Sequence, residues 1–291
     1  MKIAIHGINI QKEFTPYIQE LLSSLKDRGA LIFFTEPFFK SLKKLPIELS
    51  GHQIIKSKDG FEGIDSVISV GGDGTLLDTV CLVGKAQIPI IGINTGRLGF
   101  LATVAKENIP LAVEQLFAGD YTIESRSLVS IHADRPLFDG LNFGLNEFTI
   151  HKRDTSSMIT VHTYINGQYL NSYWADGLIV ATPTGSTGYS LSCGGPLIAP
   201  GARNFVITPV SPHNLNVRPI IVSDESEITF KIEGRTQKFL ISLDSRSTAV
   251  DATVELKLKK ADFTARLIKF LNYSYFDTLR FKLNWGFDMR N

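Results

Sequence analysis

The stretch Val67-Ile-Ser-Val-Gly-Gly-Asp-Gly-Thr-Leu-Leu-Asp-Thr-Val80 decides the fold of the first part of this chain. A short apolar run typical of a β-strand, Val67 to Val70, leads through a glycine cluster into a helical pattern from Thr75. Glycines in such a turn let the backbone approach a ligand without an intervening Cβ. The N–H groups of the turn and of the following helix N-terminus attract anions. We therefore predict a ligand site at the carboxyl edge of a sheet.

The glycine cluster surrounds a single carboxylate, in the order Gly71-Gly72-Asp73-Gly74-Thr75. An acidic side chain in an anion-binding turn is electrostatically unfavourable unless it binds a metal or accepts a proton. The alternative is a tight turn in which Asp73 only caps the helix. Because three glycines flank one carboxylate, we favour a functional site. We predict that Gly71, Gly72, Gly74 and Thr75 form a phosphate loop and that Asp73 is catalytic.

Strand-like and helix-like segments alternate on both sides of this motif. Strand patterns cover Lys2 to Ile5, Leu31 to Phe34 and Ile90 to Ile93. A helix is predicted from Thr15-Pro16, with Thr15 as N-cap and Pro16 at the first helical position. Alternation of this kind indicates parallel strands joined by right-handed crossovers, which is an α/β domain.

The pattern changes to β-strands after about residue 120. Runs at Ile159 to Ile165 and from Gln168 flank Asn166-Gly167, which predicts a hairpin. The end of the chain, from Asp277, regains helical spacing. We predict an α/β domain at 1–120, an antiparallel all-β domain at 121–264, and a segment at 265–291 that packs back on the first domain.

Bulk properties exclude several classes of protein. The 291 residues are 43% hydrophobic and 20% charged, with a formal net charge of +1. No long-range field would attract nucleic acid or a membrane surface, and no apolar run is long enough to span a bilayer. With only two cysteines and an N-terminus that reads as a first strand, we expect a cytoplasmic protein. The six histidines lack the spacing of a zinc site.

Two absent motifs narrow the chemistry further. There is no GxxxxGK[ST] sequence, so the chain is not a P-loop enzyme, and the first strand is not followed by GxGxxG. A second polar segment runs from Asp176 to Pro196 and contains Thr-Pro-Thr-Gly-Ser-Thr-Gly-Tyr-Ser. Its hydroxyls can bind amide, ribose and adenine edges, and Tyr189 offers a stacking surface. A polar connection between strands is the alternative interpretation. The pair Asn146-Glu147 is uninformative alone.

Taken together, these stretches resemble the NAD kinase family over most of the chain. The resemblance rests on Gly71 to Thr75, Gly92 to Leu101, Asn146-Glu147, Asp176 to Pro196, and Thr208 to His213 with Arg218-Pro219. Gly-Gly-Asp-Gly alone is shared with lipid kinases and phosphofructokinases. The long segment from Asp176 is the part of the resemblance that is specific to the family, since it follows Gly71 to Thr75 and Asn146-Glu147 in that order.

The resemblance implies an α/β lobe, a β-sandwich-like lobe and an active site between them. By position, Asp73 corresponds to the base that acts on the ribose hydroxyl. The expected NAD-binding residues are Gly74, Phe100, Asn146, Glu147, Asp176, Thr187, Tyr189, Ser192 and Asp244. This sequence departs from the family in three places. Gly188 replaces a common Ala, Trp174 stands where a basic residue is frequent, and Ser245-Arg246 replaces a frequent Gly-Gln.

The implied reaction transfers the γ-phosphoryl group of ATP to the 2′-hydroxyl of NAD, with Mg²⁺ as counter-charge held mainly by the nucleotide. A homodimer or homotetramer is expected. Two alternatives stay open, a lipid kinase of the diacylglycerol type and a non-catalytic NAD(P)-sensing module. The phosphoryl donor and the acceptance of NADH are undetermined by the sequence.

Overall fold

The computed structural model describes residues 1–291 except 50–51, 97–98, 154–156, 236–237, 272 and 287–291. Arg97 and Leu98, which belong to the motif from Gly92 to Leu101, lie outside the described residues. The chain divides into an α/β unit, residues 1–124 and 265–291, and a β unit, residues 125–264. The boundaries between the two units fall within two strands, β7 (Tyr121–Ala133) and β18 (Leu256–Phe270). The helical C-terminal segment therefore belongs to the first unit.

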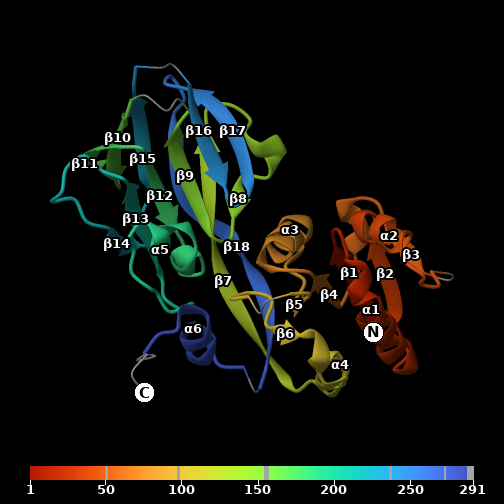
Figure 1. Cartoon of the computed structure of the whole chain (residues 1–291). Coiled ribbons are helices and arrows are strands. Elements are labelled where there is room, and N and C mark those ends of the chain that lie inside the picture. The colour runs from red at the N-terminus through yellow and green to blue at the C-terminus, as the bar shows by residue number, and fades with distance from the viewer. Residues whose placement is uncertain (50–51, 97–98, 154–156, 236–237, 272, 287–291) are drawn as a thin grey trace. The chain divides into compact units, whose positions relative to one another are not determined.

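The α/β unit is built on parallel strands in the order β18-β5-β4-β1-β2-β3, with β6 paired to β5 (Figure 1). The strands are β1 (Lys2–Gly7), β2 (Leu31–Thr35), β3 (Gln53–Ile55), β4 (Ser66–Val70), β5 (Ile90–Asn94) and β6 (Val104–Ala105). The helices are α1 (Thr15–Asp27), α2 (Glu36–Leu42), α3 (Asp73–Val83), α4 (Ile109–Ala118) and α6 (Tyr275–Leu283). The predicted α/β architecture is confirmed.

Helix α1 begins where the Thr15-Pro16 signal predicted, but the predicted N-cap is wrong. Phe14 occupies the cap position and makes no side-chain cap bond. The Thr15 hydroxyl instead donates to the Lys12 carbonyl at 2.6 Å, because a 3₁₀ turn at Lys12–Phe14 precedes the helix and supplies that acceptor. The apolar face Ile18, Leu21, Leu22 and Leu25 is buried in the core of the unit, as its spacing requires.

The β unit contains two antiparallel sheets. One has the order β14-β13-β12-β9-β16-β17, and the other includes β11-β10-β15-β18, with β7 paired to β18 and to β8. The strands are β8 (Phe143–Gly144), β9 (Glu147–Lys152), β10 (Ile159–Ile165), β11 (Gln168–Ala175), β12 (Gly177–Ala181), β13 (Asn204–Val210), β14 (Ile220–Ser223), β15 (Ile228–Glu233), β16 (Lys238–Leu243) and β17 (Arg246–Asp251). A short helix, α5, covers Tyr189–Ser192. The predicted hairpin is present, with positive φ at Asn166 and Gly167.

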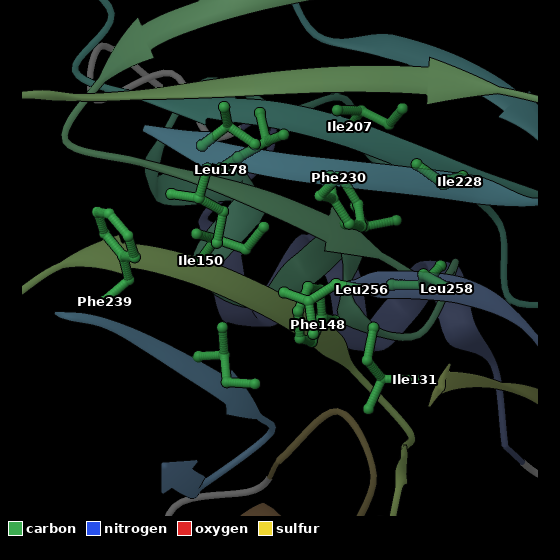
Figure 2. Packing of buried hydrophobic residues seen from close by; sticks show 14 of the residues in the cluster. Ile131, Phe148, Ile150, Leu178, Ile207, Ile228, Phe230, Phe239, Leu256 and Leu258 are labelled. Atoms are coloured by element: carbon green, nitrogen blue, oxygen red, sulfur yellow. The ribbon is translucent and has the colours of Figure 1, made fainter. Parts of the chain in front are cut away.

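One hydrophobic core joins the two sheets of the β unit. Figure 2 shows Phe148 and Ile150 of β9 packed with Phe230 of β15 and Leu256 of β18. The rings of Phe148 and Phe230 lie 5.9 Å apart, so aromatic side chains from both sheets meet in the interior. This arrangement is a β-sandwich. No helix among the described residues is long and apolar enough to cross a membrane.

Candidate functional site

The glycine turn follows β4, whose five residues are all buried, and leads directly into α3. A Cβ on Gly71 would lie 2.2 Å from the Thr75 hydroxyl oxygen, so only glycine allows the strand to turn this tightly onto the helix. Asp73 is in the first turn of α3, where the positive end of the helix dipole stabilises a carboxylate. The local sequence therefore forms the predicted strand-turn-helix unit.

The Asp73 carboxylate binds a backbone segment that lies far from it in sequence. Its Oδ2 accepts from the N–H of Phe100 at 2.9 Å, and its Oδ1 accepts from the N–H groups of Leu101 and Ala102, both at 3.0 Å. A Cβ on Gly99 would lie 1.9 Å from Asp73 Oδ1, so this approach requires glycine. Asp73 thus holds the segment 99–102 against the glycine turn, a role that the sequence did not reveal.

The carboxylate keeps the capacity to bind one further donor. An ionised carboxylate offers about four lone-pair positions. Three are used, two on Oδ1 and one on Oδ2. Apart from its chain neighbours and the backbone of its own helix, no described residue comes within 4 Å of a Cβ built on Gly72 or Gly74, and both glycines are exposed. The turn on either side of Asp73 is therefore open to a ligand.

In the β unit, Asp244 makes the same type of contact with the Asn146-Glu147 motif. Its Oδ2 accepts from the N–H of Leu145 at 2.8 Å, and its Oδ1 accepts from the N–H groups of Asn146 at 2.8 Å and Glu147 at 3.1 Å. Asp244 occupies the turn between β16 and β17 with φ of 51°. Burial raises the pKa of Asp244, while these backbone N–H groups and the Arg246 guanidinium oppose that shift. The carboxylate orients the turn at residues 145–147.

Glu147 carries a second strongly perturbed carboxyl in this region. Burial, together with the nearby negative charge of Asp244, raises the pKa of Glu147 to about 8. Its Oε2 atom is buried and has no hydrogen-bond partner among the described residues. A Cβ on Gly188 would lie 3.2 Å from this Oε2. The glycine that departs from the family pattern therefore leaves space beside the Glu147 carboxyl.

The polar segment after β12 packs directly on the Asn146-Glu147 motif. The Thr182 N–H donates to the Asn146 carbonyl at 2.8 Å, and the Thr182 hydroxyl donates to the Leu145 carbonyl at 2.6 Å. A Cβ on Gly185 would lie 2.1 Å from the Asn146 carbonyl oxygen. Two of the sequence motifs, separated along the chain, are thus packed against each other in the β unit.

Only some hydroxyls of this segment face outward. The Ser186 hydroxyl donates to the Pro183 carbonyl at 2.7 Å, and the hydroxyls of Ser190 and Thr208 pair at 2.8 Å. These buried groups stabilise the loop itself, and none of them is among the residues that were predicted to bind NAD. Thr187 is half-buried, whereas Tyr189 and Ser192 are exposed. These three are the residues of the segment that were predicted to bind NAD.

Asp176 has a partner that the sequence did not indicate. The Lys152 ammonium lies 2.6 Å from the Asp176 carboxylate, because the antiparallel pairing of β9 with β12 brings the end of one strand to the start of the other. His151, adjacent to Lys152, stacks on Tyr189 with ring centroids 5.5 Å apart. Sequence spacing alone gives no sign of either contact, since both depend on strand register.

The remaining departures from the family pattern also have structural contacts. Trp174 is exposed, and its ring contacts that of His213 in a tilted arrangement with centroids 4.1 Å apart. Arg246 donates to the carbonyls of Leu141 and Phe143, which support the strand before the Asn146-Glu147 turn. Among the described residues, no group of three His, Cys, Asp or Glu side chains could hold a metal ion.

Solved structures of kinases share this fold, as two examples show. A yeast NADH kinase complexed with NADH superposes with a TM-score of 0.89, at 20% identity, covering 100% of this chain and 89% of the other. An NAD kinase from Archaeoglobus fulgidus in complex with ATP has a TM-score of 0.76 at 28% identity, covering 98% and 99%. The fold and the glycine turn with its carboxylate define the class of this protein, a kinase that transfers a phosphoryl group.

Family models and relatives identify the member of that class. The ATP-NAD kinase N-terminal domain matches residues 5–121, and the ATP-NAD kinase C-terminal domain matches residues 145–270. NAD kinases from Cytophaga hutchinsonii and Bacteroides fragilis are 52% and 44% identical, each over 100% of both chains. The chain belongs to the NAD kinase family, and its activity is that of a phosphotransferase acting on NAD.

Proposed function

We propose that this chain transfers the γ-phosphoryl group of ATP to the 2′-hydroxyl of the adenosine ribose of NAD and that Asp73 orients and deprotonates this hydroxyl. One observation carries the proposal. Asp73 is fixed by three backbone N–H groups beside a glycine turn that is open at Gly72 and Gly74. A carboxylate held in this way can accept a hydroxyl proton without moving.

The transition state of phosphoryl transfer requires mainly positioning and charge stabilisation. The N–H groups at the start of α3 are suited to phosphate oxygens. The free lone pair on Asp73 Oδ2 is suited to the acceptor hydroxyl. Because the same carboxylate binds the Phe100 N–H, it also positions the segment that we expect beside the adenine.

The β unit supplies the groups that we assign to NAD. The proposed contacts combine hydrogen-bonding groups with one exposed ring, that of Tyr189. They are Asn146, Glu147, Asp176, Thr187, Tyr189 and Ser192. Asp244 has a different role in this proposal. Its carboxylate positions residues 145–147 through their backbone N–H groups and does not itself bind NAD.

A magnesium ion fits this site as a partner of the nucleotide. We expect this ion to be held mainly by phosphate oxygens of the nucleotide and by water. When bound, it neutralises charge on the transferring phosphoryl group.

A coupled assay for NADP formation from ATP and NAD tests the proposed reaction. We expect NADP to form only when ATP, NAD and Mg²⁺ are all present. The absence of NADP formation from the folded wild-type protein would contradict the proposal. Parallel reactions with diacylglycerol as acceptor test a lipid kinase, and NAD binding without turnover would indicate a sensor. Replacing ATP by polyphosphate, and NAD by NADH, defines the donor and the acceptor.

We also propose a cytoplasmic homodimer or homotetramer. The sequence contains only two cysteines, Cys81 and Cys193, and such a low cysteine content is compatible with a reducing compartment. Sedimentation at micromolar concentrations would test the assembly, since a monomer at all concentrations contradicts it.

A further inference from the structure

Arg126 is a buried arginine in β7 that none of the sequence motifs includes. Its side chain is only 2% exposed. Arginine stays charged at all physiological pH values, and a buried charge is costly unless its partners are well placed. Its Nη1 donates to the Thr184 hydroxyl oxygen at 3.1 Å, across 58 positions of sequence.

Thr184 occupies a structurally important position in the polar segment. It is the N-cap residue of the 3₁₀ turn Gly185–Thr187, and its carbonyl accepts from the Thr187 hydroxyl at 3.3 Å. The turn leads directly through Gly188 into Tyr189. Any shift of Thr184 would therefore move Thr187 and Tyr189, two of the residues that we assign to NAD.

We propose that Arg126 is a positioning residue for NAD: through the Thr184 hydroxyl it fixes the turn that presents Thr187 and Tyr189 to the dinucleotide. This inference rests on the proposed function, because it concerns the same binding segment. It assigns Arg126 no contact with the substrate. A hydrogen bond from a charged donor is stronger than one between neutral groups, which suits a loop that must keep one conformation.

The test uses a double-mutant cycle on the full-length protein. Arg126→Met removes the guanidinium, and Thr184→Val removes the hydroxyl while keeping the shape of the side chain. We expect each variant to raise KM for NAD by about tenfold, the size of effect expected on losing a hydrogen bond to a charged group. Since both changes break the same bond, the double variant should show the same increase and not the product of the two.

Several controls separate positioning from general damage. Thr184→Ser keeps the hydroxyl and should retain KM for NAD within about twofold, while KM for ATP and kcat at saturating NAD should stay near wild type in all variants. Arg135→Met is the matched arginine control in the same unit, because Arg135 is exposed and bonds to Asp134 and Asp251. It should leave KM for NAD unchanged.

Three outcomes would overturn the inference. A normal KM for NAD in Thr184→Val would exclude a role through Thr184, even if Arg126→Met fails to fold. Independent, multiplicative effects would show that Arg126 does not act on NAD binding through Thr184. A fall in the thermal midpoint of Arg126→Met with an unchanged KM would indicate a purely structural role. An inactive wild-type protein would instead contradict the proposed function.

Discussion

Asp73 in the α/β unit and Asp244 in the β unit form the same hydrogen-bond pattern in different surroundings. Each carboxylate accepts three bonds from consecutive backbone N–H groups, at residues 100–102 and 145–147 respectively. Asp73 adjoins two exposed glycines, Gly72 and Gly74, whereas burial raises the pKa of Asp244. The bonding pattern thus identifies carboxylates that organise a site. We propose that Asp73, which lies beside the exposed glycines, is the one of the two that also takes part in the reaction.

The largest effect expected from this comparison is on turnover by Asp73→Asn. We predict a fall in kcat of about 10²–10⁴, because the base is lost. The side-chain NH₂ of the new asparagine would also face a backbone N–H group that now donates to Asp73. Part of the fall in kcat would therefore come from a shift of the segment 99–102. Steady-state kinetics at saturating ATP and NAD measure the effect, with circular dichroism as the check on folding. A kcat close to wild type would show that Asp73 is not the base.

Asp244→Asn is the matched substitution in the β unit. We predict an increase in KM for NAD and a loss of about 1–3 kcal/mol in the free energy of unfolding, because a backbone N–H of residues 145–147 loses its acceptor. The value of kcat at saturation should change much less than in Asp73→Asn. Urea titration and NAD titration measure the two quantities. Equal losses of kcat in both variants would break the distinction between the two carboxylates.

Glu147→Gln tests the electrostatic environment next to Asp244. The pKa of Glu147 is raised from 4.5 to about 8, so between these values the folded protein holds a proton that the unfolded chain releases. The free energy of unfolding should therefore decrease as pH rises through this window. Because glutamine does not titrate, the free energy of unfolding of Glu147→Gln should lack this decrease with pH. Denaturant midpoints for both proteins at about pH 5 and about pH 9 provide the measurement. Identical pH dependence in the two proteins would contradict the raised pKa.

Gly188→Ala should give the smallest effect. The added methyl group would lie 3.2 Å from both Glu147 Oε2 and the Gly185 carbonyl oxygen, so each neighbour must move by only a few tenths of an ångström. We expect a change in stability below about 1 kcal/mol and little change in KM for NAD. Thermal unfolding and NAD titration measure both. A large rise in KM would show that Glu147 needs the space that Gly188 leaves.

Local sequence signals predicted the glycine turn well, because its constraints are local. A strand, three glycines and a helix follow one another, and Gly71 must accommodate Thr75 only four residues away. The hairpin at Asn166-Gly167 was predictable for the same reason. In contrast, the cap at Thr15 was predicted wrongly, because a 3₁₀ turn before the helix offered its hydroxyl another acceptor.

The pairing of distant segments could not be read from spacing. Three contacts depend on how the strands align. They are the bond between Arg126 and Thr184, the ion pair of Lys152 with Asp176, and the contact of Asp244 with residues 145–147. Register in a sheet is set by the packing of the whole core, so single residues carry little information about it. The hydroxyls of Ser186 and Ser190 illustrate the same point, since only the fold shows that they face inward.

The sequence by itself determined the α/β and β architecture, the glycine turn around Asp73 and, through resemblance, the NAD kinase family. Those features follow from periodicity, from glycine's freedom of conformation and from the order of motifs along the chain. The tertiary structure alone decided which polar groups are available and which are used to hold loops. Nothing in the sequence around Asp73 and Asp244 relates the two residues, yet each binds three backbone N–H groups. The reason is that a buried or partly buried backbone donor must find an acceptor wherever the fold places one.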